Sequence, residues 1–330
     1  MRATGPGDPG AGVPDAGVPQ AGVPDAGVPE ALEVVRAGAL TTVQDLGRPG
    51  HAHLGVPRSG ALDPAAHRLA NLLAGNAAGA ATLETTLDGT AVRVRTDVTA
   101  AVTGAPCPVR IDGRPAAWGA PVRVPAGAVL DVGGAVGGLR SYVAFGGGVA
   151  VRPVLGSRAT DLLSGLGPAP LEAGQLLPLG APGEPAPGPV DAVPLPAPPD
   201  ELVLPLVLGP RADRFTDAAL RALPEAGYRV SAASNRIGLR TEGPPLERAD
   251  GAELPSEGMV LGAVQVPPDG LPVLFLADHP VTGGYPVIGV VPEDRLGAAA
   301  QAVPGTPVVF VPVHGRPAPP SPGAPDRTPR

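Results

Sequence analysis

A short segment near the end of the chain concentrates side chains that could do chemistry. Between two apolar runs, Asp278 to Tyr285 contains a carboxylate, an imidazole, a hydroxyl, two adjacent glycines and a phenol. Gly283 and Gly284 leave backbone N–H groups open to an anionic or carbonyl ligand. Asp278, Thr282 and Tyr285 could orient that ligand or transfer a proton. A loop that is only well hydrogen-bonded would have the same composition, so both interpretations stay open.

A second polar cluster lies earlier in the same half of the chain. A predicted turn places two guanidinium groups beside two short polar side chains: Ser234, Asn235, Arg236 and Arg240. Arginine binds carboxylate or phosphate in two-point geometry, which makes Arg236 and Arg240 candidates for holding an anionic group. Asn235 and the later Gln265 supply amides that could hydrogen-bond a substrate amide. The alternative is that Ser234 and Asn235 stabilise the turn while both arginines face solvent.

The first half of the chain carries fewer candidates. Asp45 and Arg48 share one loop. They either line the same binding cleft as the residues above, from the first half of the chain, or form a surface salt bridge that contributes little to stability. Asp63 is explained as a helix N-cap, and Ser59-Gly60 before it could place backbone N–H groups at an anion-binding helix N-terminus. Glu84 lies in an apolar strand-like run, so it either faces solvent or has a purpose-built partner.

Many short strands and few helices must position these groups. The clearest helix begins after the N-cap Asp63 with Pro64 in its first turn, and Gly75 ends it. Short strand-like runs separated by turn residues follow, which is typical of a barrel or a sandwich. In the second half, Glu201–Leu208 is a continuous apolar strand and Pro307–Val313 is the last strand. The sequence therefore predicts a mainly β protein with two lobes.

Proline-rich segments divide the chain into five parts. Residues 1–30 contain four AGVP(D/Q/E) repeats, and their regular prolines predict a disordered tail. Residues 181–200 hold eight prolines and predict an extended linker. These segments leave an N-terminal β-barrel lobe at residues 31–180 and a C-terminal β lobe at 201–314. Residues 315–330 are a second tail predicted to be disordered.

The composition excludes several kinds of chemistry. The chain has no lysine, so it cannot form a Schiff base, build a Walker A phosphate loop or carry covalent biotin. A net charge of −7 without a basic patch argues against nucleic acid as the partner. The histidines lack a regular ligand spacing, so no metal site is predicted. Because no apolar run reaches membrane-spanning length, we expect no membrane association and a soluble cytoplasmic protein.

A series of short motifs extends in order from about Leu32 to Val313. The motifs are Thr41–Arg48, Ser59–Asp63, Asn71–Asn76, Leu83-Glu84, Thr103-Gly104, Arg140–Tyr142, Gly156-Ser157, Thr160–Leu162, Ser234–Arg236, Gly238, Arg240, Gln265–Pro267 and Thr282–Pro286. Together they resemble the allophanate hydrolase subunit 2 family, also called the C subunit of 5-oxoprolinase, which includes KipA-type antagonists of a histidine-kinase inhibitor. The resemblance covers essentially all of the part of the chain predicted to fold.

This resemblance implies a fold, an activity and partners. The fold would consist of cyclophilin-like β-barrel domains. The activity would be that of an ATP-dependent 5-oxoprolinase, which opens 5-oxo-L-proline to L-glutamate. This hydrolase component would be active only in a hetero-oligomer with the A and B subunits of 5-oxoprolinase, the second of which is similar to allophanate hydrolase subunit 1. ATP would bind in that complex.

Residue chemistry then suggests roles within the site. We predict catalytic roles for Asp278, Tyr285 and Arg236. Substrate-binding roles are predicted for Asn235, Arg240, Gln265, Thr282, Gly283, Gly284, Arg48, Asp45 and Ser234.

Two other functions share the same motifs. One is a biotin-dependent carboxyltransferase acting on urea or a similar amide, with the biotin on a lysine of another chain. The other is a non-catalytic regulator that binds a kinase-inhibitor sister protein. The sequence alone does not choose among the three.

Overall fold

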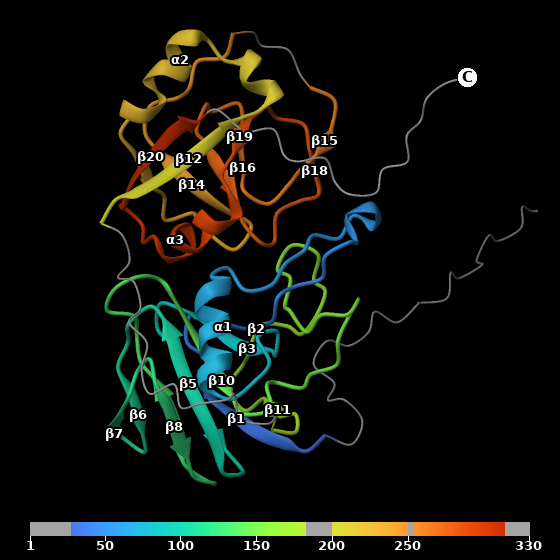
Figure 1. Cartoon of the computed structure of the whole chain (residues 1–330), viewed down its shortest axis with the longest axis vertical. Coiled ribbons are helices and arrows are strands. Elements are labelled where there is room, and N and C mark those ends of the chain that lie inside the picture. Colours follow the sequence, from blue (N-terminus) through green and yellow to red (C-terminus); the bar gives the residue numbers. More distant parts are fainter. Residues whose placement is uncertain (1–27, 183–199, 250–253, 314–330) are drawn as a thin grey trace, which may run out of the picture.

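The computed structural model describes residues 28–182, 200–249 and 254–313. Most of the predicted repeat tail and linker, and all of the predicted C-terminal tail, lie outside the described residues. Figure 1 shows two regions stacked along the long axis of the molecule, a sandwich of sheets and a barrel.

The N-terminal region is built from two antiparallel sheets. The first has the order β11 (Leu176–Pro178), β1 (Glu30–Arg36), β4 (Thr90–Val94), β9 (Val129–Val132), β6 (Val109–Ile111) and β7 (Arg114–Ala116). The second has the order β2 (Leu40–Gln44), β3 (Thr82–Thr86), β10 (Arg140–Phe145), β5 (Val98–Gly104) and β8 (Pro121–Val124). Apolar side chains from both sheets form one buried cluster, including Leu32, Leu83, Leu130 and Val143. This region is therefore a two-sheet sandwich, and the prediction of a β-barrel for residues 31–180 is wrong, because these strands form two separate sheets that pack face to face over one core.

One helix covers the outer face of the five-stranded sheet. Helix α1 (Pro64–Leu73) begins as predicted: the Asp63 side chain accepts a hydrogen bond from the Ala66 N–H at 3.0 Å. Ala70 and Leu73 of the helix pack on Tyr142 in a buried cluster. The helix runs alongside the sandwich, and its start, at Asp63, meets the C-terminal region, where Gln301 donates a hydrogen bond to Asp63 (Figure 1).

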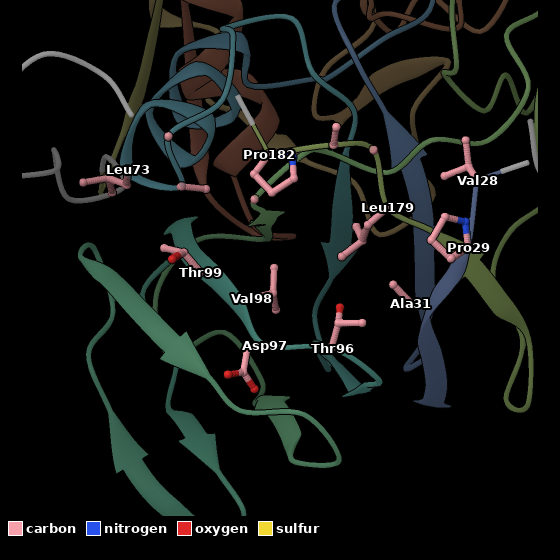
Figure 2. Close-up of a pocket in the computed structure, with 15 residues that line it drawn as sticks. Val28, Pro29, Ala31, Leu73, Thr96, Asp97, Val98, Thr99, Leu179 and Pro182 are labelled. Atoms are coloured by element: carbon pink, nitrogen blue, oxygen red, sulfur yellow. The ribbon is translucent and has the colours of Figure 1, made fainter. Parts of the chain in front are cut away.

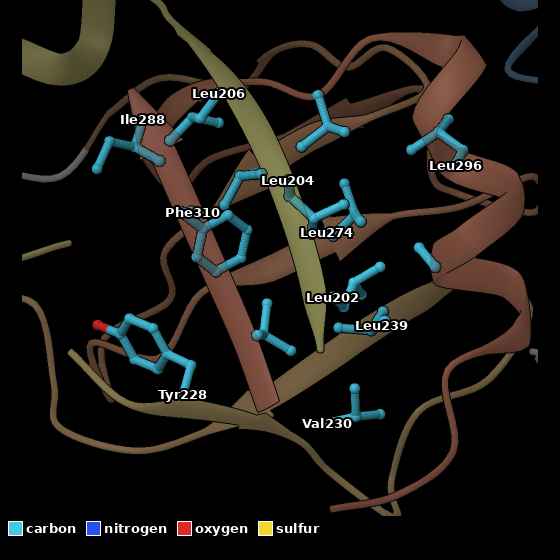
Figure 3. Packing of buried hydrophobic residues seen from close by; sticks show 14 of the residues in the cluster. Leu202, Leu204, Leu206, Tyr228, Val230, Leu239, Leu274, Ile288, Leu296 and Phe310 are labelled. Atoms are coloured by element: carbon cyan, nitrogen blue, oxygen red, sulfur yellow. The ribbon is translucent and has the colours of Figure 1, made fainter. Parts of the chain in front are cut away.

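The C-terminal region is a closed barrel of seven strands. Their order is β12 (Leu202–Leu208), β19 (Val287–Val290), β16 (Ala263–Gln265), β17 (Val273–Phe275), β14 (Gly238–Glu242), β13 (Tyr228–Val230) and β20 (Pro307–Val313). Alternate residues of these strands fill the barrel, and Figure 3 shows Leu204, Leu274, Ile288 and Phe310 converging inside it. The predicted mainly β fold is confirmed.

Short elements complete the described chain. Strands β15 (Glu257–Gly258) and β18 (Thr282–Gly283) pair outside the barrel. The remaining helices are α2 (Asp217–Ala222) and α3 (Leu296–Gln301), with single 3-10 turns η1 (Ala52–Leu54), η2 (Pro210–Arg214), η3 (Leu223–Glu225) and η4 (Glu293–Arg295). Within the described residues, no helix is long and apolar enough to cross a membrane.

Candidate functional site

Arg236 lies at the junction between the barrel and the sandwich and is only 1% exposed. Its guanidinium donates two hydrogen bonds to Asp278, from Nε at 2.9 Å and from Nη2 at 3.1 Å. Nη2 also donates to the Gly60 carbonyl at 2.7 Å, and Nη1 donates to Glu84. Burial alone would lower the pKa of Arg236, but the two carboxylates outweigh it and raise that pKa. The protein itself therefore engages all three nitrogens of the guanidinium.

Asp278 is fully buried at the same junction. Besides Arg236, its carboxylate accepts hydrogen bonds from the Ser59 hydroxyl at 2.7 Å and the Leu162 N–H at 3.2 Å. Both of these donors belong to the sandwich side. Arg236 and Asp278 consequently form a buried ion pair that joins the two regions, which is a structural explanation for two of the three predicted catalytic residues.

The predicted anion site at the start of α1 is filled by the protein's own Glu84. The Glu84 carboxylate accepts hydrogen bonds from the Leu62 N–H at 3.0 Å and the Tyr142 hydroxyl at 2.8 Å. Burial raises the pKa of Glu84, but Arg236 and Arg140 outweigh it, so the net pKa lies below its usual value. This helix N-terminus therefore has no free cradle for the phosphates of ATP.

Asp45 and Arg48 lie in the sandwich, close to the junction, and both are buried. Asp45 accepts hydrogen bonds from the Gly47 N–H at 2.8 Å and the Ser157 hydroxyl at 2.6 Å. The Arg48 guanidinium donates to the Ala159 carbonyl and lies 3.9 Å from Asp161. The surface salt bridge considered for Asp45 and Arg48 does not form, because each residue has other partners.

A second group of predicted residues lies on the outer face of the barrel. Strand alternation turns one set of side chains away from the barrel core: Arg240, Ala263, Gln265, Val273, Phe275 and Val287. Four of them lie beside Met259 in a small apolar cluster of their own. Gln265 is buried on this face, and its Nε2 donates to the Tyr285 carbonyl at 3.3 Å.

The glycine pair makes room for that amide. A Cβ added at Gly283 would lie 2.9 Å from Gln265 Nε2 and 3.1 Å from Met259 Cε. A side chain at Gly283 would therefore displace Gln265. Thr282 and Tyr285 on either side of the glycines are exposed, and 46% of Tyr285 is open to solvent. The exposed Thr282 and Tyr285 and the buried Gln265, which is 6% exposed, are thus brought together on this side of the barrel, which we call the outer-face site.

His279 is a member of this site that the predicted residue list omitted. Its ring stacks on Phe275, with ring centroids 5.9 Å apart and planes at 16°. Its Nδ1 lies 2.8 Å from the Pro280 carbonyl, and since a carbonyl only accepts, Nδ1 must carry the proton. Burial lowers the pKa of His279, so the ring is neutral near pH 7 with Nε2 as an acceptor. An imidazole beside a glycine-rich turn was the available signal in the sequence.

The predicted Ser234–Arg240 cluster forms one turn, but its two arginine side chains lie in different environments. Asn235 accepts hydrogen bonds from the backbone N–H groups of Ile237 at 2.8 Å and Gly238 at 3.3 Å, so its side chain stabilises the turn. The Ser234 hydroxyl accepts from the Arg240 N–H at 3.0 Å. The Arg240 side chain is exposed and extends from β14, next to Val273 of β17. Of the two arginines, only Arg240 is available to a ligand on the outer face.

A cavity of about 740 Å³ opens elsewhere, at the far end of the sandwich (Figure 2). Its walls are mostly apolar and include Ala31, Leu73, Val98 and Leu179. None of the predicted site residues lines it. The predicted site residues therefore lie at the junction and on the outer face, not at this cavity.

Comparison with known proteins identifies the family. The model of the family described as "Carboxyltransferase domain, subdomain A and B" matches residues 54–312. The C subunit of 5-oxoprolinase from Escherichia coli (strain K12) is 38% identical over 283 residues, which cover 85% of this chain and 90% of that protein. The urea amidolyase of Lachancea kluyveri is 33% identical over 309 residues, which cover 86% of this chain and 17% of that protein.

A solved structure supports the same relationship. The crystal structure of TTHA0988 superposes with a TM-score of 0.80 at 36% identity and covers 94% of this chain. The match covers 60% of the TTHA0988 chain, so that relative is the longer of the two. The matches span both the sandwich and the closed barrel, and this chain therefore belongs to the carboxyltransferase domain family, subdomains A and B.

Proposed function

We propose that this chain is the C subunit of an ATP-dependent 5-oxoprolinase, which opens 5-oxo-L-proline to L-glutamate together with the A and B partner subunits. The observation that carries this proposal is the coverage of the relatives. This chain matches 90% of the E. coli 5-oxoprolinase component, but only 17% of the L. kluyveri urea amidolyase. A match over nearly the whole length supports an equivalent role in a multi-chain enzyme. We propose that this enzyme works in the cytoplasm, where ATP is available.

The outer-face site has groups that suit a small lactam carrying a carboxylate. The exposed guanidinium of Arg240 would bind the carboxylate, and the Gln265 amide would hydrogen-bond the planar ring amide. Backbone N–H groups of Gly283 and Gly284 would stabilise negative charge that develops on the carbonyl oxygen. Thr282 would help to orient the ring.

Hydrolysis of the ring needs one water and two proton transfers. The oxygen of water bonds to the lactam carbon, the C–N bond breaks, and the nitrogen gains a proton to become the amine of glutamate. His279 would accept a proton from the water through Nε2, and the exposed Tyr285 hydroxyl would donate one to the leaving nitrogen. Arg236 and Asp278 would hold the two regions together, because their hydrogen bonds cross the junction. Asp45 and Arg48 would support loops of the sandwich, where their partners lie.

We assign the binding of ATP to the partner chains, which would couple its cleavage to this ring opening. Within the described residues the α1 N-terminus is occupied by Glu84 and Asp63, and repulsion between carboxylate and phosphate disfavours a nucleotide there.

The test is ATP-dependent release of glutamate from 5-oxo-L-proline by this chain co-expressed with A and B subunits. We expect activity only when all three chains and ATP are present. Full activity without this chain would contradict the proposal. A tight complex with the B subunit, without turnover, would favour the non-catalytic regulator instead.

The second candidate is a biotin-dependent carboxyltransferase acting on urea or a similar amide. The 33% identity to a urea amidolyase favours it. Because this chain has no lysine, the biotin would have to be carried by another chain. Consumption of urea with a carboxybiotin carrier, and no glutamate release from 5-oxo-L-proline, would favour this second function over the first.

A further inference from the structure

The Asp278–Pro286 segment connects the junction to the outer-face site. Its first residue, Asp278, is fully buried and bound by four donors, two of which come from the sandwich side. The next residue, His279, stacks on Phe275, and the segment continues to Tyr285. Whatever fixes Asp278 therefore also fixes the start of the segment that carries the site.

Glu84 is the sandwich residue on which this arrangement depends. It lies on β3, is 2% exposed, and reaches across the junction to Arg236. Arg140 approaches the same carboxylate at 3.8 Å. The buried pairs thus contain two positive and two negative side chains, since Asp278 is the second acid. Removing the charge of Glu84 would leave two buried guanidiniums facing one carboxylate.

We propose that Glu84 is a positioning residue for the outer-face site. Its carboxylate holds Arg236, Arg236 holds Asp278, and Asp278 holds the start of the Asp278–Pro286 segment. The sandwich thereby sets the geometry of a site that lies on the barrel. Glu84 itself touches no substrate, and the identity of that substrate rests on the proposed function.

A buried network of this kind transmits position because it has few alternative arrangements. Each oxygen of Glu84 is engaged: Oε1 by Arg236, and Oε2 by the Leu62 N–H and Tyr142 hydroxyl. A carboxylate with these donors cannot move without leaving a buried donor unpaired, which costs free energy. A neutral amide at position 84 keeps the shape but presents an NH₂ group to donors that need an acceptor.

The test uses Glu84→Gln and measures hydrogen exchange along the full chain by mass spectrometry. We expect amides of the Asp278–Pro286 segment to exchange at least about tenfold faster, while strands β4 and β9 in the six-stranded sheet keep their protection. Glu33→Gln is the matched control: it is a half-exposed strand acid with Arg93 at 3.8 Å, and it should change nothing in that segment.

A milder variant covers the possibility that Glu84→Gln does not fold. Tyr142→Phe removes one donor to Glu84 and keeps every charge, so a smaller acceleration of exchange should appear in the same segment. Wild-type exchange in that segment in both variants, or acceleration spread evenly over the chain, would overturn the proposal.

Kinetics of the reconstituted complex separate positioning from stability alone. We expect Glu84→Gln to lower kcat by about tenfold or more with KM nearly unchanged, because the catalytic groups are misplaced while the exposed Arg240 still binds. Unchanged kcat with a loosened segment would overturn the positioning role. If Glu84→Gln accelerates exchange in the Asp278–Pro286 segment but the wild-type complex has no activity, the proposed function is refuted. The role of Glu84 in positioning the segment would still hold.

Discussion

Replacing Arg236 by alanine should destabilise the whole chain strongly. The substitution removes three hydrogen bonds to the carboxylates of Asp278 and Glu84, and one to the Gly60 carbonyl. Both acids would stay buried, at 0% and 2% exposure, with their main counter-charge gone. Breaking a buried ion pair by removing one partner costs about 3–5 kcal/mol. We expect a loss within that range, since Ser59 and Leu62 still bind the stranded carboxylates.

Arg240→Ala is the matched control, four positions along the chain. Its side chain is exposed, and an exposed substitution of this kind changes stability by about 0.5 kcal/mol or less. Urea unfolding followed by circular dichroism at pH 7 measures both variants. A loss below about 1 kcal/mol for Arg236→Ala, or equal losses for both variants, would refute the role given to the junction.

The pH dependence gives an independent check on Arg236→Ala. In the wild type the pKa of Glu84 lies below its usual value of 4.5, so its contribution to stability is present above pH 4.5 and is lost on acidification. Without Arg236 that pKa rises, and protonation of Glu84 relieves the buried charge. The difference in stability between variant and wild type should therefore shrink as the pH falls from 7 towards 4.5. A constant difference would contradict this reasoning.

Three further predictions concern the interior and the site. Burial lowers the pKa of His67 from 6.5 to about 4, so between these pH values the unfolded chain binds a proton that the folded chain does not. The free energy of unfolding should therefore fall by about 3 kcal/mol as the pH falls from 6.5 to 4. In His67→Gln this part of the pH dependence should be absent, as measured by urea unfolding at several pH values. Gly283→Ala should displace Gln265 and lower kcat/KM by about tenfold with little effect on thermal unfolding, since Gly283 has no positive φ; unchanged kcat/KM would count against Gln265 as a substrate contact. Tyr285→Phe should lower kcat about a hundredfold at unchanged stability, and a wild-type kcat would remove Tyr285 from the mechanism.

Local structure could be predicted from the sequence where neighbouring residues determine it. The N-cap Asp63 and the first-turn Pro64 predicted α1, and the structure confirms both. The apolar run Glu201–Leu208 predicted β12, which spans Leu202–Leu208. These features depend on hydrogen bonds and apolar patterns within a few residues, which are visible in the sequence itself.

The division of the candidate site could not be predicted, because it depends on distant partners. Arg236 and Arg240 are four residues apart and chemically identical, yet one is buried and the other is exposed. The difference comes from two buried acids that bind Arg236, Asp278 and Glu84, which lie 42 and 152 residues from Arg236 in the chain. The second of these distances explains why Glu84 could be assigned neither to solvent nor to a partner. The alternation of side chains along a strand shows which residues share a face, but it does not show which of the two faces packs against another region.

The most direct test of the account is to locate the substrate in the assembled complex of all three chains. We would determine the structure of that complex with 5-oxo-L-proline bound. We expect the ligand on the barrel's outer face, with its carboxylate at Arg240, its amide at Gln265, and its carbonyl carbon near His279. A ligand bound to Arg236 and Asp278 at the junction, or in a partner chain with the outer face of this chain unoccupied, would contradict it.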